Sequence, residues 1–405
     1  MKRVVIIGGG YGGLRALEHL CKYEQFHVAL IDKNPYHYMQ TETYGYIAGR
    51  FDIADIAVDI QSFIEGLRKN IEFIQDEVLD ISKETNEVIC KANNVAYDYL
   101  ILAVGAKTHF FSFIEGAQEH THGVKNIQRA FEFRRDFESQ LYNKLQHSAD
   151  SEAEDFHIAI AGAGLSGVEI AAEMGYVLQH YKKSFALNSA NITISLIDAA
   201  ETILPGMDSY IVDKTRKRLK ELGVNIYERT YISKIKKESI VFNDETELPF
   251  NFAIFTAGIV GVDLIKKLDT PKNSIHQIIP DEMLRMQGTD NIFIIGDCAQ
   301  IEDANEIILP PTAQIAEKSA EYVVKNIAKL DNQQLITPFN AKVDGMFIAL
   351  GGNYAVGILF DKIKVSGYVA HLLKKLITRA YRFGLELKVN TGYKKRQIDV
   401  LEQHC

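Results

Sequence analysis

The sequence predicts an α/β protein that contains one nucleotide-binding fold twice, followed by a smaller C-terminal segment. Three observations predict this fold. An apolar strand, a glycine-rich turn and a helix begin the chain, the same pattern returns in its middle, and a basic helical stretch with one apolar face lies near its end. The 405 residues, 47% of them hydrophobic, are enough for two or three domains with separate cores.

The first turn lies in "KRVVIIGGGYGGLRALEHL", where Gly8, Gly10 and Gly13 form GxGxxG. The first glycine permits the tight turn, the second lets a pyrophosphate approach the backbone, and the third lets helix and strand pack closely. The helix N-terminus attracts the phosphates. A second strand, "HVALID", ends in Asp32, 19 residues beyond Gly13, where an acid accepts hydrogen bonds from ribose hydroxyls. These features together predict a dinucleotide site.

The second turn repeats this arrangement. "FHIAIAGAGLSGVEIAAEM" carries Gly162, Gly164 and Gly167, and "ITISLID" ends in Asp198. "YDYLILAVGAK" is likewise echoed by "FNFAIFTAGIV". The two repeats have nearly one offset, 154 residues between the glycine turns and 153 residues between the echoed segments, which indicates a duplicated fold. The sequence therefore predicts two Rossmann-like dinucleotide-binding domains.

Two dinucleotide sites in one chain indicate a flavin on one and a nicotinamide on the other, with a hydride passing between them. The 2′-phosphate of NADPH needs an arginine near the end of the second strand. Asp198 is instead followed by Ala199, Ala200 and Glu201, and the glutamate would repel a phosphate. The sequence therefore favours NADH over NADPH.

A later segment, "TDNIFIIGDCAQ", is a strand followed by Gly296 and Asp297. At this point the chain resembles the two-dinucleotide-domain flavoproteins related to glutathione reductase. The resemblance implies that the first fingerprint and Asp297 hold FAD and that the second fingerprint holds NADH. It also implies three units: a discontinuous FAD-binding domain, an inserted NADH-binding domain, and a C-terminal β-segment with a membrane-anchoring and dimerisation helix. Their residues are 1–125 with 270–335, 126–269, and 336–405.

The cysteines do not fit a disulfide reductase or a zinc site. Cys21, Cys90, Cys298 and Cys405 are widely spaced, with no CxxC pattern. One cysteine near the flavin cannot cycle a disulfide with itself, and Cys298 reads as a small packing residue. Sulfide:quinone oxidoreductases share this fold but use paired cysteines, so a relative of that class is the alternative. A membrane-bound, redox-sensing regulator with NADH and FAD as ligands is a second alternative.

The segment "LPPTAQIAEKSAEYVVKNI" predicts a helix that begins near Thr312. It resembles the AQxAxQ motif of type II NADH dehydrogenases, single-subunit enzymes that pass electrons from NADH through FAD to quinone. The first glutamine of the motif, beside the flavin and the quinone, is Gln314, and the second is replaced by Lys318. "DKNPYHYMQTETYGYIAG" and "GLSGVEIAAEM" also resemble family segments, and the latter places Glu169 near the nicotinamide and the flavin. "DGMFIALGGNYAVGI" and "KKLITRAYRFG" resemble the family's last β-segment and docking helix.

The resemblance implies catalytic roles for Glu169 and Gln314 and quinone contacts from Gln314 and Lys318. It implies the following FAD contacts: Gly8, Gly10, Tyr11, Gly13, Asp32, Lys33, Val78, Ala103, Gly105, Asp297, Ala313 and Gln314. The implied NADH contacts are Gly162, Gly164, Leu165, Ser166, Glu169, Asp198, Ala257 and Gly258. It further implies a non-proton-pumping, homodimeric enzyme of the respiratory chain that lies on the cytoplasmic face of the inner membrane and reduces ubiquinone or menaquinone.

The charge distribution supports a membrane surface as partner. The formal charge of −8 argues against nucleic acid. Residues 361–396 nevertheless hold ten Lys or Arg against two acids, a balance of +8 that leaves −16 for the rest of the chain. No apolar run is long enough to span a bilayer, so the contact is expected to be monotopic. The expected membrane contacts, within the helical stretch 367–384, are Leu372, Leu373, Lys374, Lys375, Leu376, Arg379, Arg382 and Phe383.

Overall fold

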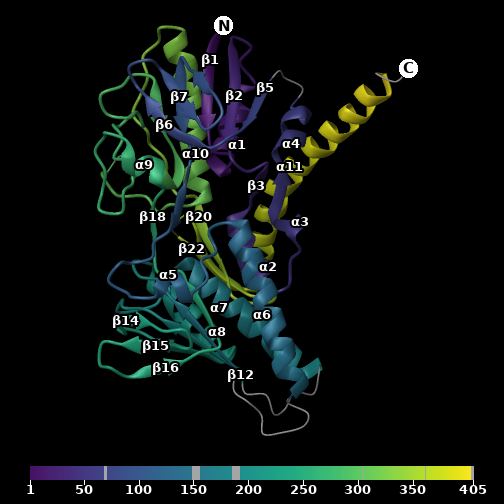
Figure 1. Ribbon diagram of the computed structural model, residues 1–405, viewed down its shortest axis with the longest axis vertical. Helices are drawn as coiled ribbons and strands as arrows, with labels where there is room; N and C mark the ends of the chain where they lie inside the picture. Colours follow the sequence, from purple (N-terminus) through teal and green to yellow (C-terminus); the bar gives the residue numbers. More distant parts are fainter. Residues whose placement is uncertain (68–70, 148–155, 185–191, 304, 361, 403–405) are drawn as a thin grey trace.

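The computed structural model describes residues 1–67, 71–147, 156–184, 192–303, 305–360 and 362–402. It contains two parallel sheets, one in each of the two lobes seen in Figure 1. The first sheet has the order β19-β9-β1-β2-β5. Its apolar strands are buried because helices and loops cover both faces. They are β1 (Lys2–Ile7), β2 (Phe26–Asp32), β5 (Ile71–Gln75), β9 (Tyr99–Leu102) and β19 (Ile292–Ile294).

The second sheet reproduces the neighbours of the first, which confirms the duplicated fold. Its order is β13-β12-β11-β17, so the strand before the glycine turn again lies between the next strand and the echoed segment. Each lobe also carries a three-stranded antiparallel sheet, β6-β7-β8 or β14-β15-β16. The parallel strands are β11 (Phe156–Ala161), β12 (Ile192–Ile197), β13 (Val224–Tyr227) and β17 (Phe252–Phe255). The antiparallel strands are β6 (Val78–Ser82), β7 (Glu87–Cys90), β8 (Asn94–Ala96), β14 (Ile232–Ile235), β15 (Ser239–Phe242) and β16 (Glu247–Pro249).

The two lobes are joined through the segments that follow the echoed strands. β10 (Ala106–Thr108) pairs antiparallel with β18 (Ile259–Gly261). Helix α1 (Tyr11–Leu20) opens the first fingerprint and packs beside α10 (Ala313–Asp331), whereas α7 (Leu165–Ser184) opens the second. The remaining helices and short strands are β3 (Tyr36–Tyr38), η1 (Gln40–Glu42), α2 (Thr43–Ile47), α3 (Ile53–Ile56), β4 (Ala57–Asp59), α4 (Ile60–Gly66), α5 (Ala117–His120), α6 (Ile127–His147), α8 (Ser209–Glu221), α9 (Asp263–Lys267) and η2 (Gly296–Cys298).

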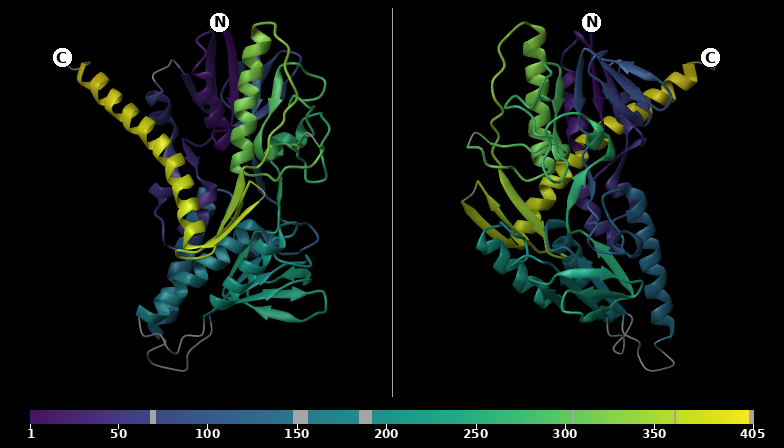
Figure 2. Two further views of the ribbon diagram at one scale, coloured as in Figure 1. Left: turned by 180° about the vertical axis from the view of Figure 1, so that it is seen from behind. Right: turned by 60° about the vertical axis from the view of Figure 1, so that its left-hand side comes forward.

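The C-terminal segment is a three-stranded antiparallel sheet followed by one long helix. The strands are β20 (Gly345–Ala349), β21 (Ala355–Leu359) and β22 (Ile363–Gly367), and the helix is α11 (Tyr368–Glu402). The helix is longer than the predicted stretch because it continues along α4, as Figure 1 and the left view of Figure 2 show. Glycines permit this packing: a Cβ on Gly66 would overlap the Lys388 carbonyl, and one on Gly392 would overlap the Ser62 carbonyl.

The orientation of α11 corrects the predicted membrane face. Lys374 and Arg382 turn toward the protein, where they pair with Glu169 and with Asp55, and Leu373 is half-buried. The helical period predicts two faces but cannot say which one meets the body. Here the acids of the body hold the two cations, because a partly buried ion pair satisfies charges that would otherwise need water.

The outward side of α11 is apolar. Leu372, Leu376 and Phe383 are 44%, 54% and 61% exposed, and Val369 and Leu387 continue the same line along the helix. We call these five residues the apolar strip. Lys375 and Arg379 are exposed beside it. Over the described ranges, the structure contains no helix with the length and apolar character that crossing a bilayer requires.

Candidate functional site

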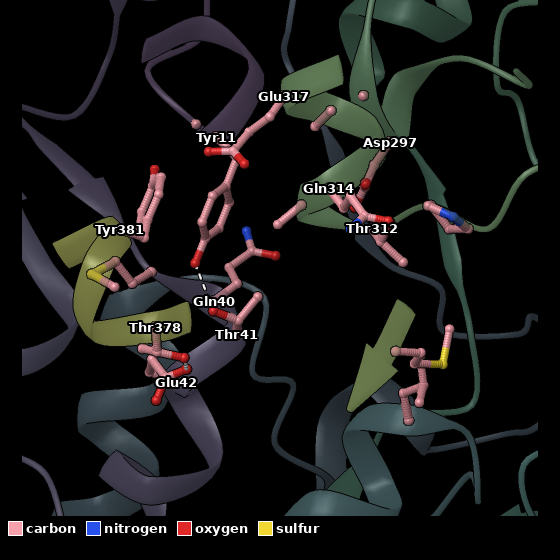
Figure 3. A pocket seen from close by; sticks show the side chains of 18 of the residues that line it. Tyr11, Gln40, Thr41, Glu42, Asp297, Thr312, Gln314, Glu317, Thr378 and Tyr381 are labelled. Atoms are coloured by element: carbon pink, nitrogen blue, oxygen red, sulfur yellow. Dashed lines mark hydrogen bonds between the residues drawn. The ribbon is translucent and has the colours of Figure 1, made fainter. Parts of the chain in front are cut away.

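A cavity of about 560 Å³ lies where the two fingerprint helices approach each other. Its walls come from the starts of α1, α7 and α10, from β20 and from α11, and the side chains from α10 and α11 face each other across it (Figure 3). Its lining includes predicted cofactor contacts and polar side chains. They are Gly10, Tyr11, Gln40, Thr41, Glu42, Ala103, Gly105, Lys125, Leu165, Ser166, Glu169, Asp297, Thr312, Ala313, Gln314, Glu317, Lys374, Thr378 and Tyr381. The cavity therefore brings together residues that lie far apart in the sequence.

The first fingerprint has the shape that a bound pyrophosphate requires. Gly8 has a φ of 106°, which favours glycine, and a Cβ on Gly13 would overlap the Gly8 carbonyl. Among the described residues, no atom except those of Gly10 and its two chain neighbours lies within 4 Å of the place that a Cβ on Gly10 would take, so the backbone there is open to a ligand. Asp32 accepts hydrogen bonds from the Gly9 and Asn34 amides at 2.6 and 2.8 Å. The residues present therefore fit a dinucleotide.

The second fingerprint repeats this geometry. Gly162 has a φ of 112°, a Cβ on Gly167 would overlap the Gly162 carbonyl, and the space beside Gly164 is open. Asp198 accepts hydrogen bonds from the Ala163 and Ala200 amides at 2.6 and 2.8 Å. Both acids thus also hold their own loops, a function that the sequence motif does not reveal. The second site fits a dinucleotide as well as the first.

One arginine beside the second site escaped the sequence analysis. The Arg229 amide donates to the Ala200 carbonyl at 2.9 Å, and its guanidinium pairs with Glu201 at 3.2 Å. Arg229 lies just after the end of β13, 28 residues after Glu201. The two side chains come together because β13 pairs beside β12 in the sheet. Glu201 would therefore repel a phosphate, and it also pairs with Arg229, the cation that would attract one.

The start of α10 places the glutamine of the motif in the cavity. The Thr312 hydroxyl caps the helix by accepting the Ile315 amide at 3.3 Å, as the prolines and threonine predicted. The Gln314 side-chain oxygen accepts the Asp344 amide at 3.0 Å. Lys318 does not line the cavity and pairs at 2.7 Å with Asp344, which does. Its side chain bridges α10 to the segment before β20, and the expected quinone contact of Lys318 stays a prediction.

Glu169 and Lys374 form an ion pair at the cavity wall. Their side chains are 14% and 15% exposed, and Glu169 also accepts the Ala349 amide at 2.9 Å. The Lys374 ammonium lies 4.9 Å from the centre of the Tyr44 ring. Nearby, Glu42 accepts the Thr378 hydroxyl at 3.2 Å, and burial raises the pKa of this carboxyl. The wall thus holds two carboxyl groups and one cation close to the start of α7.

The late Gly-Asp segment reaches the same cavity. Asp297 lies in η2 and pairs with Lys125 at 3.4 Å. Its backbone carbonyl accepts the Gln277 side chain at 3.0 Å, which holds the turn in place. Lys125 had no signal in the sequence, because a single lysine in a loop matches no motif.

The other predicted site residues lie at varying distances from the cavity. Lys33 is exposed beside Asp32, and Ala257 and Gly258 follow β17 near the second fingerprint, outside the cavity lining. Val78 begins β6 and packs against the core of the first lobe, outside the cavity lining. Its FAD contact stays a prediction.

The structure also links α11 to the first fingerprint through a buried histidine. One ring nitrogen of His37 lies 2.9 Å from the Gly9 carbonyl, and the other lies 3.1 Å from the Tyr381 hydroxyl. Burial lowers the pKa of His37 to about 4, so the imidazole is neutral at physiological pH. Sequence reasoning missed both residues, since Tyr381 lies on the presumed membrane helix.

Cys298 has the environment of a packing residue. The thiol is fully buried and donates to the Ile295 carbonyl at 3.2 Å, and burial raises its pKa to about 12. A protonated thiol is a poor nucleophile. No disulfide joins cysteines among the described residues, and Cys405 lies outside them.

We expect Cys298→Ser to keep at least about half of the parent's NADH:quinone activity, because the thiol stays protonated and takes no part in electron transfer. Steady-state turnover, normalised to flavin content, measures this. Cys90→Ser is the matched control, since Cys90 is also buried. An inactive Cys298→Ser protein with normal flavin content would restore a thiol mechanism.

Comparison with known proteins agrees with this site. Residues 2–320 match the pyridine nucleotide-disulphide oxidoreductase family, and the chain belongs to that class. A type II NADH:quinone oxidoreductase of Staphylococcus aureus (strain MSSA476) is 30% identical over 388 residues, 94% of this chain and 95% of the relative. The chain is therefore a member of the type II NADH:quinone oxidoreductase family, as the sequence motifs predicted.

Two solved structures share the fold. NDH2 from Plasmodium falciparum in complex with NADH has a TM-score of 0.83 at 22% identity, covering 97% of this chain and 96% of its own. The sulfide:quinone oxidoreductase from Aquifex aeolicus has a TM-score of 0.80 at 19% identity, covering 99% and 95%. At such identities the likeness establishes the fold, and the site residues must distinguish the activities.

Proposed function

We propose that this protein is a non-proton-pumping NADH:quinone oxidoreductase of the respiratory chain, with FAD on the first fingerprint and NADH on the second. Residues 1–125 and 270–335 form the FAD-binding domain, 126–269 the NADH-binding domain and 336–405 the C-terminal segment. The pairing of β19 with β9 supports the discontinuous first domain. The observation that carries the function is the single cavity onto which both fingerprint helices, the Gln314 turn and α11 open.

When bound, FAD accepts a hydride and passes two electrons to a quinone. The residues of the chain bind the two dinucleotides, orient the quinone and supply a proton to it. The open backbone at Gly10 and Gly164 receives the two pyrophosphates. Gln314, fixed by its hydrogen bond to the Asp344 amide, orients the quinone. Lys374 holds an ammonium group where negative charge develops on a quinone oxygen and supplies a proton, and Glu169 keeps that cation in place.

A membrane surface completes the proposal. The apolar strip offers exposed leucine and phenylalanine side chains to the headgroup region, and exposed Lys375 and Arg379 attract anionic lipid. The side of α11 opposite the apolar strip lines the cavity, so a quinone can pass along this helix from the bilayer into the cavity. The quinone is ubiquinone or menaquinone, and the protein is a homodimer on the cytoplasmic face of the inner membrane.

An anaerobic flavin titration tests the proposed function. NADH should bleach the yellow flavin band, and a soluble quinone analogue should restore it with steady turnover. Bleaching by sulfide instead of NADH would favour a sulfide:quinone oxidoreductase. Bleaching by NADH with no recovery on quinone would favour a redox-sensing regulator.

The parent should use NADH at least about tenfold better than NADPH in kcat/KM, because Glu201 repels a 2′-phosphate and pairs with Arg229. Glu201→Ala frees this arginine, so the NADPH:NADH ratio of kcat/KM should rise at least about tenfold. Glu115→Ala is the control, because it removes another exposed glutamate that pairs with a lysine, at 2.8 Å from Lys234. An unchanged NADPH:NADH ratio in Glu201→Ala would show that Arg229 does not contact the ribose 2′-phosphate.

A further inference from the structure

A second cavity, of about 130 Å³, lies between α1, α10 and α11. It has room for about four water molecules. Arg15, Glu18 and Lys388 line it with partly exposed side chains, so it borders the solvent. Glu317 lines this cavity and also the main cavity, and it shares that double position with Tyr381. Figure 3 shows the Glu317 side chain extending from α10 toward Tyr11.

The charges around Glu317 are already matched without it. The Arg15 guanidinium pairs with Glu321 at 2.6 Å and with Glu18 at 3.2 Å. Lys388 also pairs with Glu18, and the ring of His19 lies 3.6 Å from Glu321. In the part of the chain that the structure describes, the Glu317 carboxyl itself has no hydrogen bond or ion pair. Burial is the main cause that raises its pKa to about 7, and Glu18 and Glu321 add to this while Arg15 opposes it.

On the side of the main cavity, two tyrosines face Glu317. Burial raises the pKa of both Tyr11 and Tyr381, so their hydroxyls keep their protons. The Tyr11 hydroxyl lies 2.7 Å from the Thr41 hydroxyl, and that of Tyr381 lies 3.1 Å from a His37 nitrogen. Glu317 is thus the titratable group between solvent-bordering water and a lining of neutral hydroxyls.

We propose that Glu317 is a proton relay, which takes protons from the small cavity and delivers them to the main cavity during quinone reduction. This inference rests on the proposed function. The reaction is NADH + H⁺ + quinone → NAD⁺ + quinol: NADH loses one hydride, which is two electrons and one proton, and the quinone gains two electrons and two protons. One proton per turnover therefore comes from the solvent, and Glu317 gives it up inward and regains one from the water outside.

Glu317→Gln tests the relay, because glutamine has nearly the same shape and holds no acidic proton. In stopped-flow experiments on the holoenzyme, NADH bleaching should stay within about twofold of the parent. Reoxidation by a soluble quinone should be at least about tenfold slower at pH 6 and independent of pH. In the parent it should slow as the pH rises through 7, because the donor loses its proton. Added imidazole, a small proton donor, should restore the variant.

A second readout does not depend on turnover. In infrared difference spectra, the carbonyl band of a protonated carboxyl group should vanish between pH 6 and pH 8 in the parent and be missing from Glu317→Gln. Asp331→Asn is the matched control on the same helix, since Asp331 pairs with Lys2 at 3.3 Å and lines neither cavity. It should behave as the parent.

The outcomes separate the relay from the proposed function. Reoxidation of Glu317→Gln at the parent's rate, or a variant that imidazole does not restore, overturns the relay alone. A variant that also loses NADH bleaching or flavin assigns Glu317 to the packing of the cavity and overturns it too. A parent that NADH bleaches but no quinone reoxidises overturns both the proposed function and the relay.

Discussion

Replacing Leu372, Leu376 and Phe383 together with serine should lower the affinity for lipid vesicles by at least about 50-fold. These side chains are 44%, 54% and 61% exposed and lie along one side of α11. Burying one fully exposed large apolar side chain contributes about 1.5–3 kcal/mol, so these three, which are about half exposed, contribute at least about 2.4 kcal/mol together. Each 1.4 kcal/mol is a factor of ten. Co-sedimentation with vesicles measures the loss, which should be similar for neutral and anionic lipid.

The two exposed cations beside the strip provide the control. Lys375→Ser with Arg379→Ser should weaken binding to anionic vesicles by about 30-fold at low salt, at about 1 kcal/mol for each charge, and should leave neutral vesicles unaffected. NADH bleaching should be normal in both variants, because the substituted side chains point away from the body. If the serine variant of the strip still sediments with vesicles and elutes as a smaller species, then the strip joins two chains instead of meeting lipid.

Lys374→Met should slow quinone reoxidation of the flavin about 100-fold, the lower end of what a positioned proton donor contributes. Methionine keeps the length of the side chain but leaves Glu169 in the wall without its cation. A carboxylate that loses its partner in a buried place is costly, so Glu169 should take up a proton or move. NADH bleaching should slow less than reoxidation does, because both glycine turns stay intact and only Glu169, beside the second turn, loses its partner. Stopped-flow measurement of the two half-reactions separates these effects.

Lys375→Met is the matched control for this prediction. The two lysines are neighbours on α11, but Lys375 is exposed and Lys374 is paired at the cavity. Lys375→Met should keep normal reoxidation and lose about fivefold in affinity for anionic vesicles. The opposite pattern, with Lys374→Met weakening vesicle binding at normal reoxidation, would return Lys374 to the lipid face where the helical period placed it.

Local motifs predicted most of the fold. The glycine turns, the acids at Asp32 and Asp198 and the echoed strands each depend on steric rules that act over a few residues, and all appear where expected. Their repetition at nearly one offset predicted a duplicated fold, and the corresponding strands of the two sheets have the same order. The capped start of α10 followed in the same way from Thr312 and the prolines before it.

The candidate site was only partly predictable. Glu169 and Gln314 were found because each lies in a motif, and both line the cavity. Glu317 had a weak signal, since it lies one turn after Gln314 on the same side of α10. Arg229 and Tyr381 had none, because they reach the sites through strand pairing and helix docking between segments far apart in the sequence.

The sequence by itself determined two nucleotide-binding folds, the start of α10 and an amphipathic last helix. Each of these follows from local glycine, capping and periodicity rules. Only the tertiary structure decided which side of that helix meets the protein. The period of 3.6 residues separates a basic face from an apolar one, but it does not predict which face packs against the rest of the protein. Acids on the body, Glu169 and Asp55, pair with Lys374 and Arg382, and this contact turns the apolar strip outward.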